Sequence, residues 1–414
     1  MTALHTSSQP ILHTLSNGLR IVYLTSSRPI SWVGVAIDSG TRDELPDECG
    51  MAHFVEHMLF KGTARRHSYH IISRLESIGG QLDAYTTKEE TYVYATIPTI
   101  YTDRALELLA DITLHSTFPA HEIERERDVV LDEIQSYNDS PSELIYDEYE
   151  SLLYPTDTIG RNILGTEESL NKMTSHDLLR YTGRMYRANR MTVFYMGAKS
   201  DNYVLHQIER HFAGAPAGTT ISRSISAQYT PFTQSFNRDT YQAHCLIGNR
   251  CCSMSDSQRH ATILLNNILG GPSMVSRLNL AVRERNGLCY NIESNTNFYT
   301  DTGVWTIYFG CDHRNMKRAL HLCMRQMALL RDKPLSDRQL RLAKQQLRGQ
   351  VLIANENLEN MILGISKTVL HNIPLRSDDE QLKIIDSLSA DDIRHQAQIL
   401  FDPDRLSTLQ YIDN

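Results

Sequence analysis

The chain has 414 residues, of which 41% are hydrophobic and 22% charged, and its formal net charge at pH 7 is −8. This composition is typical of a globular protein, and the length exceeds what one hydrophobic core usually supports, so two domains are expected. A negative charge without any stripe of Lys and Arg argues against a nucleic-acid-binding protein.

The sequence also argues against export and against membrane insertion. The N-terminal segment lacks a basic region followed by a long apolar run, so no signal peptide is expected. No window approaches 18 uninterrupted apolar residues, so no membrane span is expected either. The seven cysteines include no C-x-x-C pair, which favours reduced thiols over a disulfide framework. Together these features predict a cytoplasmic protein.

In chain order, the first half alternates between segments with strand periodicity and longer segments with helical periodicity. Strands are predicted over residues 19–24, 31–37, 91–97 and 191–196, and helices over residues 101–114, 122–137 and 177–186. Asp139, Ser140 and Pro141 end the second of these helices. This order predicts the α+β class, with helices packed on one side of a mostly antiparallel sheet.

The chain repeats itself over half its length. "DRALELL" at residues 103–109 returns as "KRALHLC" at an offset of 214, and "SHDLLRY" at residues 175–181 returns as "SADDIRH" at the same offset. A period this long indicates a duplicated domain rather than a solenoid. A segment rich in Gly, Ala, Ser, Thr and Pro separates the copies. The predicted domains are residues 1–213 and 229–414, with a linker over residues 214–228.

The stretch "CGMAHFVEHMLFKGT" carries three ionisable groups, His53, Glu56 and His57, within an apolar helix pattern. Residues four apart lie on one face of a helix, so both histidines can reach one zinc ion, which then needs a third protein ligand. Glu56 stands beside a ligand and is suited to act as general base on a water. The alternative is three ordinary helix residues, although buried ionisable groups normally require a partner or a metal.

A carboxylate on another helix is the expected third ligand. In "HEIERERDVVLDEIQSYNDSP", Glu126 and Glu133 lie seven residues apart on one helix face, whereas Glu122, Glu124 and Asp132 are expected in solvent. The alternative is that all of these carboxylates form an exposed acidic face.

These motifs resemble a known family. The reversed H-x-x-E-H order is the inverzincin signature, and "GMAHFVEHMLFKGT" closely resembles the pitrilysin, insulin-degrading-enzyme and mitochondrial-processing-peptidase family. In that family the third zinc ligand is a glutamate about 76 residues after the second histidine, and counting from His57 gives Glu133. A further family glutamate, seven residues earlier, supports the site and corresponds to Glu126. The duplicated α+β unit also matches the family.

The second half resembles the same family. "LNLAVRERNGLCYNIES" is similar to a segment in which an arginine and, seven residues later, a tyrosine contact the substrate backbone near the metal; here these are Arg283 and Tyr290. Such donors polarise the scissile carbonyl or stabilise the oxyanion. The alternative is a surface arginine and a half-buried strand tyrosine. At the repeat offset the motif positions hold Asn267, Gly270 and Gly271, so one Zn²⁺ per chain is expected, in the first domain.

A hairpin after the motif offers a place for substrate. The resemblance implies that its first arm binds an extended peptide through main-chain hydrogen bonds. The residues concerned are Leu82, Asp83, Ala84, Tyr85 and Thr86. A plain hairpin is the alternative. Glu89 and Glu90 follow in the turn and are expected to be exposed and solvated.

The resemblance further implies an assembly. Some members close four such domains around a peptide, so a chain with two is expected to form a dimer in which Arg283 and Tyr290 act on the partner's zinc. The partner is an identical chain or an inactive paralogue. The predicted function is a zinc-dependent endopeptidase that cleaves peptides or unfolded segments inside a dimeric chamber. The alternatives are a non-catalytic structural or partner subunit of the same fold, and a scaffold that binds metal without hydrolysis.

Overall fold

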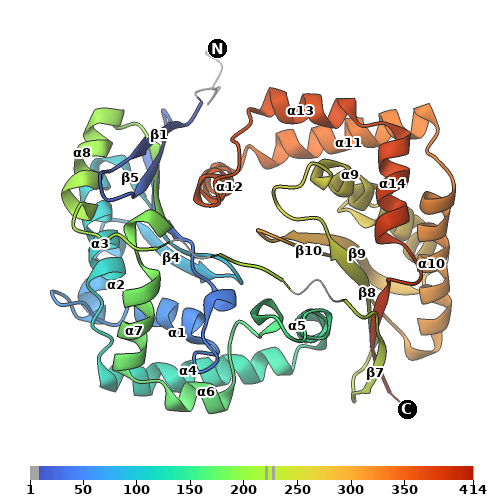
Figure 1. Ribbon diagram of the computed structural model, residues 1–414, viewed down its shortest axis with the longest axis horizontal. Helices are drawn as coiled ribbons and strands as arrows, with labels where there is room; N and C mark the ends of the chain where they lie inside the picture. The colour runs from blue at the N-terminus through green and yellow to red at the C-terminus, as the bar shows by residue number, and fades with distance from the viewer. Residues whose placement is uncertain (1–8, 220–221, 226–228, 414) are drawn as a thin grey trace. The chain divides into compact units, whose positions relative to one another are not determined.

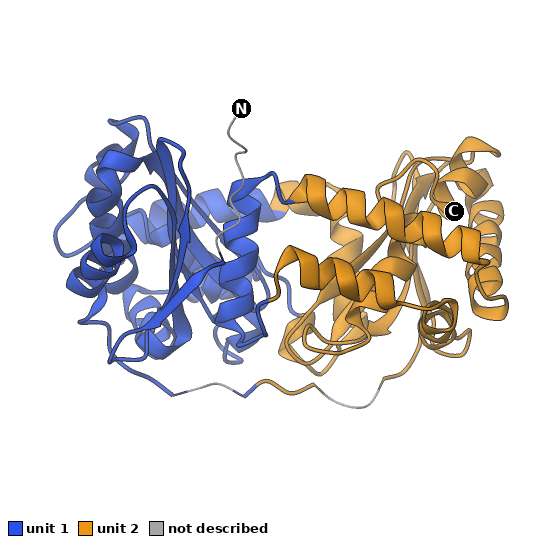
Figure 2. Ribbon diagram, turned by 90° about the horizontal axis from the view of Figure 1, so that it is seen from above, with its two compact units in different colours: residues 1–134, 161–222, 355–375 blue, residues 135–160, 223–354, 376–414 orange. Residues whose placement is uncertain are grey.

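The computed structural model describes residues 9–219, 222–225 and 229–413 (Figure 1). The chain forms two compact units (Figure 2). Unit 1 comprises residues 1–134, 161–222 and 355–375, and unit 2 comprises residues 135–160, 223–354 and 376–414. Among the described residues, no helix is long and apolar enough to cross a membrane.

Unit 1 is built on a six-stranded sheet with the order β1-β2-β6-β3-β5-β4. Among the described strands of this sheet, only β2 and β6 pair in parallel. Side chains of a strand alternate between the two faces of a sheet, and in β3 Val33 and Val35 enter one apolar cluster while Trp32 and Ala36 enter another. Both faces of this sheet are therefore covered. The strands are β1 (Ile11–Thr14), β2 (Arg20–Thr25), β3 (Ile30–Ile37), β4 (Gln81–Thr86), β5 (Thr91–Pro98) and β6 (Met191–Gly197).

Helices cover the two faces of the unit 1 sheet unequally. A layer of helices packs on one face through the larger apolar cluster. These helices are α1 (Met51–Met58), α2 (Ser68–Glu76), α3 (Thr102–Leu114), α4 (Ala120–Asn138), α6 (Glu167–Lys172), α7 (Ser175–Met185) and α8 (Asp201–Phe212). The other face is covered by α12 (Leu358–Leu370), through residues such as Leu358 and Ile362.

Unit 2 repeats this plan around a five-stranded sheet with the order β7-β11-β8-β10-β9, and β7–β11 is the one parallel pair among its described strands. The strands are β7 (Thr233–Asn237), β8 (Ala243–Cys251), β9 (Cys289–Phe298), β10 (Gly303–Cys311) and β11 (Ser407–Ile412). One face carries α9 (Arg259–Gly270), α10 (Met316–Asp332), α11 (Asp337–Ala354), α13 (Asp378–Ser387) and α14 (Ala390–Leu400). The other carries α5 (Pro141–Leu153), and a π-helix, η5 (Asn279–Glu284), precedes β9.

The two units exchange one helix each. Helix α5 comes from the first half of the sequence but packs in unit 2, and α12 comes from the second half but packs in unit 1. The sequence divided the chain into continuous domains, 1–213 and 229–414, whereas the compact units are discontinuous. Each sheet has a second apolar face that needs a cover, and local sequence patterns do not reveal which helix supplies it. Part of the predicted linker, residues 220–221 and 226–228, lies outside the described residues.

Candidate metal centre and catalytic site

Helix α1 begins at a sharply defined point. Gly50, its N-cap, has φ of +83°, and a Cβ added there would lie 2.7 Å from the Cα of Gly165, so a glycine is required. The buried carboxylate of Glu44 accepts hydrogen bonds from the backbone N–H of Gly50 (3.0 Å) and of Ala52 (2.9 Å). These bonds satisfy N–H groups that a helix start leaves without partners. The start of α1, and hence the direction of its side chains, is thereby fixed.

Helices α1 and α4 bring two histidines and one carboxylate together. The Oε2 atom of Glu133 lies 3.7 Å from Nε2 of His53 and 3.6 Å from Nε2 of His57. One donor atom from each residue lies within 4.8 Å of the other two. The His53 side chain is 9% exposed and that of Glu133 44%, so the cluster opens from the buried helix face towards solvent. The structure thus gathers the three residues proposed as ligands, and their role as ligands stays a prediction.

Glu126 orients one of the two imidazoles. Its Oε1 accepts a hydrogen bond of 2.9 Å from Nδ1 of His57, and its Oε2 pairs with the ammonium of Lys61. Burial opposes ionisation of Glu126, but the hydrogen bonds and charges of His57 and Lys61 outweigh it and lower the carboxyl pKa. With Nδ1 as donor, Nε2 of His57 presents its lone pair towards Glu133. Apart from its place four residues after His57, nothing in the sequence pointed to Lys61 as a member of this network.

The second imidazole is held neutral. Burial, and then the neighbouring His57, lowers the pKa of His53 to about 3. Its Nδ1 is buried and has no hydrogen-bond partner among the described residues. Two imidazoles and one carboxylate form the donor set of a catalytic zinc site with an open fourth position, so the residues present fit this metal.

Glu56 stands beside the donors, on the side of the edge strand β4. Burial raises the pKa of its carboxyl group, and the Thr86 hydroxyl and the charge of His57 act in the opposite direction. A carboxyl group whose pKa lies above its usual value is a better proton acceptor near neutrality.

Strand β4 forms one edge of its sheet and, in the described part of the chain, pairs only with β5. Leu82 and Ala84 pack against the apolar cluster beneath the helices. Tyr85 points to the opposite face and stacks on Tyr92, with ring centroids 4.8 Å apart. The strand that the sequence proposed for substrate binding therefore has one main-chain edge without a neighbouring strand.

The expectation that Glu89 and Glu90 are solvated is wrong. Their exposed fractions are 1% and 2%. Glu89 pairs with Arg42 at 2.5 Å, and Glu90 pairs with Lys367 at 2.9 Å and with His371 at 2.6 Å. Neither carboxylate is available to a substrate. Lys367 lies on α12 and His371 directly after it, in a segment that the sequence assigned to the other domain.

Arg283 and Tyr290 lie in unit 2, in η5 and on β9 respectively. The Arg283 side chain is 41% exposed, with Nε 3.8 Å from Glu284 Oε1. Tyr290 is 85% exposed, so it is more open to solvent than a half-buried strand residue.

Known proteins resemble this chain along its length. Residues 20–167 match the model described as insulinase (peptidase family M16), and residues 172–347 match the one described as peptidase M16 inactive domain. An uncharacterized zinc protease of Bacillus subtilis is 30% identical over 95% of this chain and 96% of its own length. One of Rickettsia felis is 32% identical over 94% of each chain.

Solved structures extend the likeness to the fold. A structure from Pseudomonas fluorescens, described as a peptidase M16 inactive domain, has a TM-score of 0.92 at 18% identity over 98% of each chain. A protease from Helicobacter pylori has a TM-score of 0.88 at 19% identity, over 97% of this chain and 99% of that one. The predicted fold, two homologous α+β domains, is confirmed.

Proposed function

Since the chain belongs to peptidase family M16, we propose that it is a zinc-dependent endopeptidase that cleaves peptides or unfolded segments inside a dimeric chamber. One observation carries this proposal: the donor atoms of His53, His57 and Glu133 converge beside the partly buried carboxyl group of Glu56. If α1 only had to pack as an apolar helix, there would be no physical reason for three ionisable groups on it to meet a fourth from α4.

The chain's own residues would hold one Zn²⁺. His53 and His57 offer their Nε2 atoms and Glu133 its carboxylate, while Glu126 keeps His57 in the required tautomer and orientation. When bound, zinc supplies Lewis acidity that lowers the pKa of a water to about 7. His53 carries no proton near neutrality, so no proton has to leave this ligand before metal binds.

Glu56 would act first as general base and then as general acid in the hydrolytic reaction. It accepts a proton from the attacking water as oxygen bonds to the peptide carbonyl carbon. It then donates that proton to the amide nitrogen as the C–N bond breaks, which leaves a carboxylic acid and an amine. The burial that raises its pKa supports both transfers, because a carboxyl group with a pKa nearer neutrality gains and loses a proton readily.

The substrate would lie along β4. An extended peptide can pair with the free main-chain edge of residues 82–86, on the strand that carries Thr86 beside Glu56. Main-chain hydrogen bonds position the scissile bond whatever the side chains of the substrate are, which suits peptides of varied sequence.

Arg283 and Tyr290 would act in trans. Both side chains are exposed and carry donors suited to a developing oxyanion. In a homodimer, or in a heterodimer with an inactive paralogue, they would reach the zinc site of the other subunit. The alternative, a non-catalytic partner subunit, is not supported by a donor set this complete.

The test compares the wild type with Glu56→Gln by metal analysis and by hydrolysis of a quenched peptide library. We expect about one zinc per chain in both proteins, and at least a 10²-fold lower cleavage rate in the variant, because the base is lost while the ligands remain. Zinc binding without cleavage by the wild type would contradict the proposal and favour the non-catalytic alternative. Equal cleavage by both proteins would remove Glu56 from the mechanism.

A further inference from the structure

The turn that joins β4 to β5 is buried, which is unusual for the tip of a hairpin. Lys88, Glu89 and Glu90 follow one another in it, and all three side chains are buried. The turn begins at Thr87, whose hydroxyl donates to Oε2 of Glu90 at 2.7 Å and accepts from the Glu90 N–H at 2.9 Å. Three consecutive charged groups are costly to bury without partners, so the surrounding chain must hold this turn in place.

Two segments of unit 1 bind the first half of the turn. Lys88 donates through Nζ to the carbonyl oxygen of Arg161. The Arg42 guanidinium pairs with Glu89 at 2.5 Å, and the Arg42 N–H donates to the carbonyl oxygen of Lys88 at 2.8 Å. The backbones also approach closely, because a Cβ added to Gly40 would lie 2.4 Å from the carbonyl carbon of Lys88. These contacts hold the side of the turn that faces the helix layer of unit 1.

The third segment is α12, which comes from the second half of the chain. Oε1 of Glu90 lies 2.9 Å from the Lys367 ammonium and accepts a hydrogen bond of 2.6 Å from Nε2 of His371. Without these two donors the Glu90 carboxylate would stay buried with a hydroxyl and a backbone N–H nearby and no ammonium. A carboxylate in that position is strongly destabilising, so movement of the turn into solvent would be favoured.

Helix α12 also contacts the opposite end of the hairpin. Oε2 of Glu359 accepts a hydrogen bond of 3.1 Å from the Thr96 hydroxyl. Thr96 pairs in register with Gln81, the first residue of β4. Between the two ends, Tyr85 of β4 packs against the apolar cluster that α12 shares with the sheet. The helix therefore contacts both ends of the hairpin that carries the edge strand.

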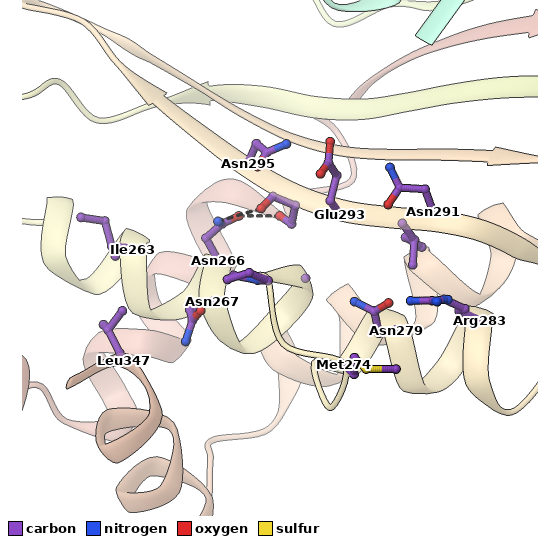
Figure 3. Close-up of a pocket in the computed structure, with 15 residues that line it drawn as sticks. Ile263, Asn266, Asn267, Met274, Asn279, Arg283, Asn291, Glu293, Asn295 and Leu347 are labelled. Carbon is purple, nitrogen blue, oxygen red and sulfur yellow. Dashed lines mark hydrogen bonds between the residues drawn. The ribbon is translucent and has the colours of Figure 1, made fainter. Parts of the chain in front are cut away.

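Unit 2 repeats this arrangement around its own edge strand. Strand β9 borders a pocket of about 320 Å³, and Glu293 on this strand lines it (Figure 3). Helix α5, which comes from the first half of the chain, reaches the strand through the Tyr146 hydroxyl, which donates to Glu293 at 2.9 Å. It also reaches the turn between β9 and β10, where Tyr299 donates to Glu150 at 2.9 Å. In both units the exchanged helix thus contacts the edge hairpin.

We propose that Lys367 and His371 are positioning residues for peptide substrates: by binding Glu90 they hold the turn that fixes the free edge of β4. The assignment of this edge to the substrate rests on the proposed function. The turn adjoins the reaction site, since Thr86 precedes it and lies beside Glu56. An edge strand has a neighbour on one side, so its place depends strongly on the turn at its end. A peptide that pairs with an edge already in place does not have to order it and binds more tightly for that reason.

The first measurement is amide hydrogen exchange, followed by mass spectrometry, in a double variant that combines Lys367→Met with His371→Leu. We expect the β4 amides that bond to β5 to exchange at least about tenfold faster, because the turn moves to solvate Glu90. Strand β1, the opposite edge of the same sheet, is the internal reference and should not change. His371→Gln keeps an N–H donor for Glu90 and should exchange like the wild type.

The effect on substrate is measured in two backgrounds. With Glu56→Gln, which removes the proposed base, the Kd of a fluorescent unfolded peptide should rise about tenfold in the double variant, because fewer molecules present the edge. In the active background KM should rise by the same factor while kcat stays within about twofold, since ground state and transition state lose the same binding. His211→Leu breaks a histidine–carboxylate pair with Asp103 away from the hairpin and should change none of these quantities.

The proposal is overturned if the β4 amides keep their protection, or if β1 loses protection equally, which would make α12 a general cover of the sheet. It is also overturned if β4 exchanges faster but Kd and KM do not change, or if kcat falls while KM does not. A wild-type protein that binds the peptide but does not cleave it would contradict the proposed function instead, and the exchange and Kd measurements would still decide this inference.

Discussion

Helices α1 and α9 occupy the same place in two copies of one fold, and they differ where chemistry would occur. Each lies beside the edge strand of its sheet, β4 or β9. Unit 1 has His, Glu, His and, on α4, Glu at the four positions where unit 2 has Asn, Gly, Gly and, on α11, Leu. Because unit 2 folds without these ionisable groups, the fold does not require them. Packing alone therefore does not account for their presence in unit 1, whereas the proposed site would.

The second covering helices make a similar contrast. Helix α12 is held on unit 1 by buried ion pairs, in which Glu90 binds Lys367 and His371. Helix α5 is held on unit 2 by tyrosine hydrogen bonds, with Tyr146 donating to Glu293 and Tyr411 donating to Glu148, and by a partly exposed ion pair between Glu148 and Arg238. A buried ion pair that loses one partner leaves a charge without compensation, so the attachment of α12 should be more sensitive to acid and to mutation.

The largest effect is expected at the donor cluster. Glu133→Gln should lose most of the bound zinc and lower peptide hydrolysis by at least about 10³-fold, because Lewis-acid stabilisation contributes several kcal/mol. Asp132→Asn, which changes a neighbouring exposed carboxylate on α4, should change neither quantity. Metal analysis and a peptide cleavage assay on both variants measure this. If Glu133→Gln kept full zinc content and activity, the ionisable residues that distinguish unit 1 from unit 2 would not form a catalytic site.

A smaller effect, on the free energy of unfolding, is expected when the ion pairs that attach α12 to unit 1 are broken. Burial opposes ionisation of Glu90, but the hydrogen bond from His371 and the charges of Lys367 and His371 lower its pKa to about 2. The unfolded value is higher, so this ion pair stabilises the fold at pH values above about 4.5, and the contribution is lost as the pH falls towards about 2.

Glu90→Gln should therefore lower the free energy of unfolding at neutral pH by about 3 kcal/mol and reduce its loss in acid. Chemical denaturation at a series of pH values measures both. Glu148→Gln, in the part-exposed attachment of α5, is the matched control and should cost less. Equal losses in the two variants would remove the contrast between the covering helices.

The smallest effect is expected in a complementation experiment, in which unit 2 of one subunit would complete the zinc site in unit 1 of the other. Arg283→Ala and Glu56→Gln chains should each be inactive alone. Random mixing should restore about a quarter of wild-type activity, because half of the dimers are mixed and each has one complete site. Cleavage after subunit exchange, with the mixed dimer verified by native mass spectrometry, measures this. Mixed dimers that remain inactive would show that unit 2 does not serve a partner's zinc site.

Much of the fold and of the site could be predicted from local patterns. The helix predicted over residues 101–114 is α3 (Thr102–Leu114), and the helix predicted over 122–137 is α4, which ends at Asn138, just before the predicted break. Helical periodicity placed His53 and His57 on one face, and the family spacing selected Glu133. Those residues do converge.

Other features depended on contacts between distant parts of the chain. The sequence did not indicate that Lys61 would share Glu126 with His57, or that α5 and α12 would be exchanged. Glu90 and His371 are 281 residues apart, and a glutamate in a turn looks solvated until a helix from elsewhere buries it. By itself the sequence determined the duplicated α+β plan and the residues proposed to bind metal, because a repeat, a motif and a spacing can all be recognised in the order of the residues. Only the tertiary structure decided which faces are covered and which charges are paired, because burial is a property of the assembled chain.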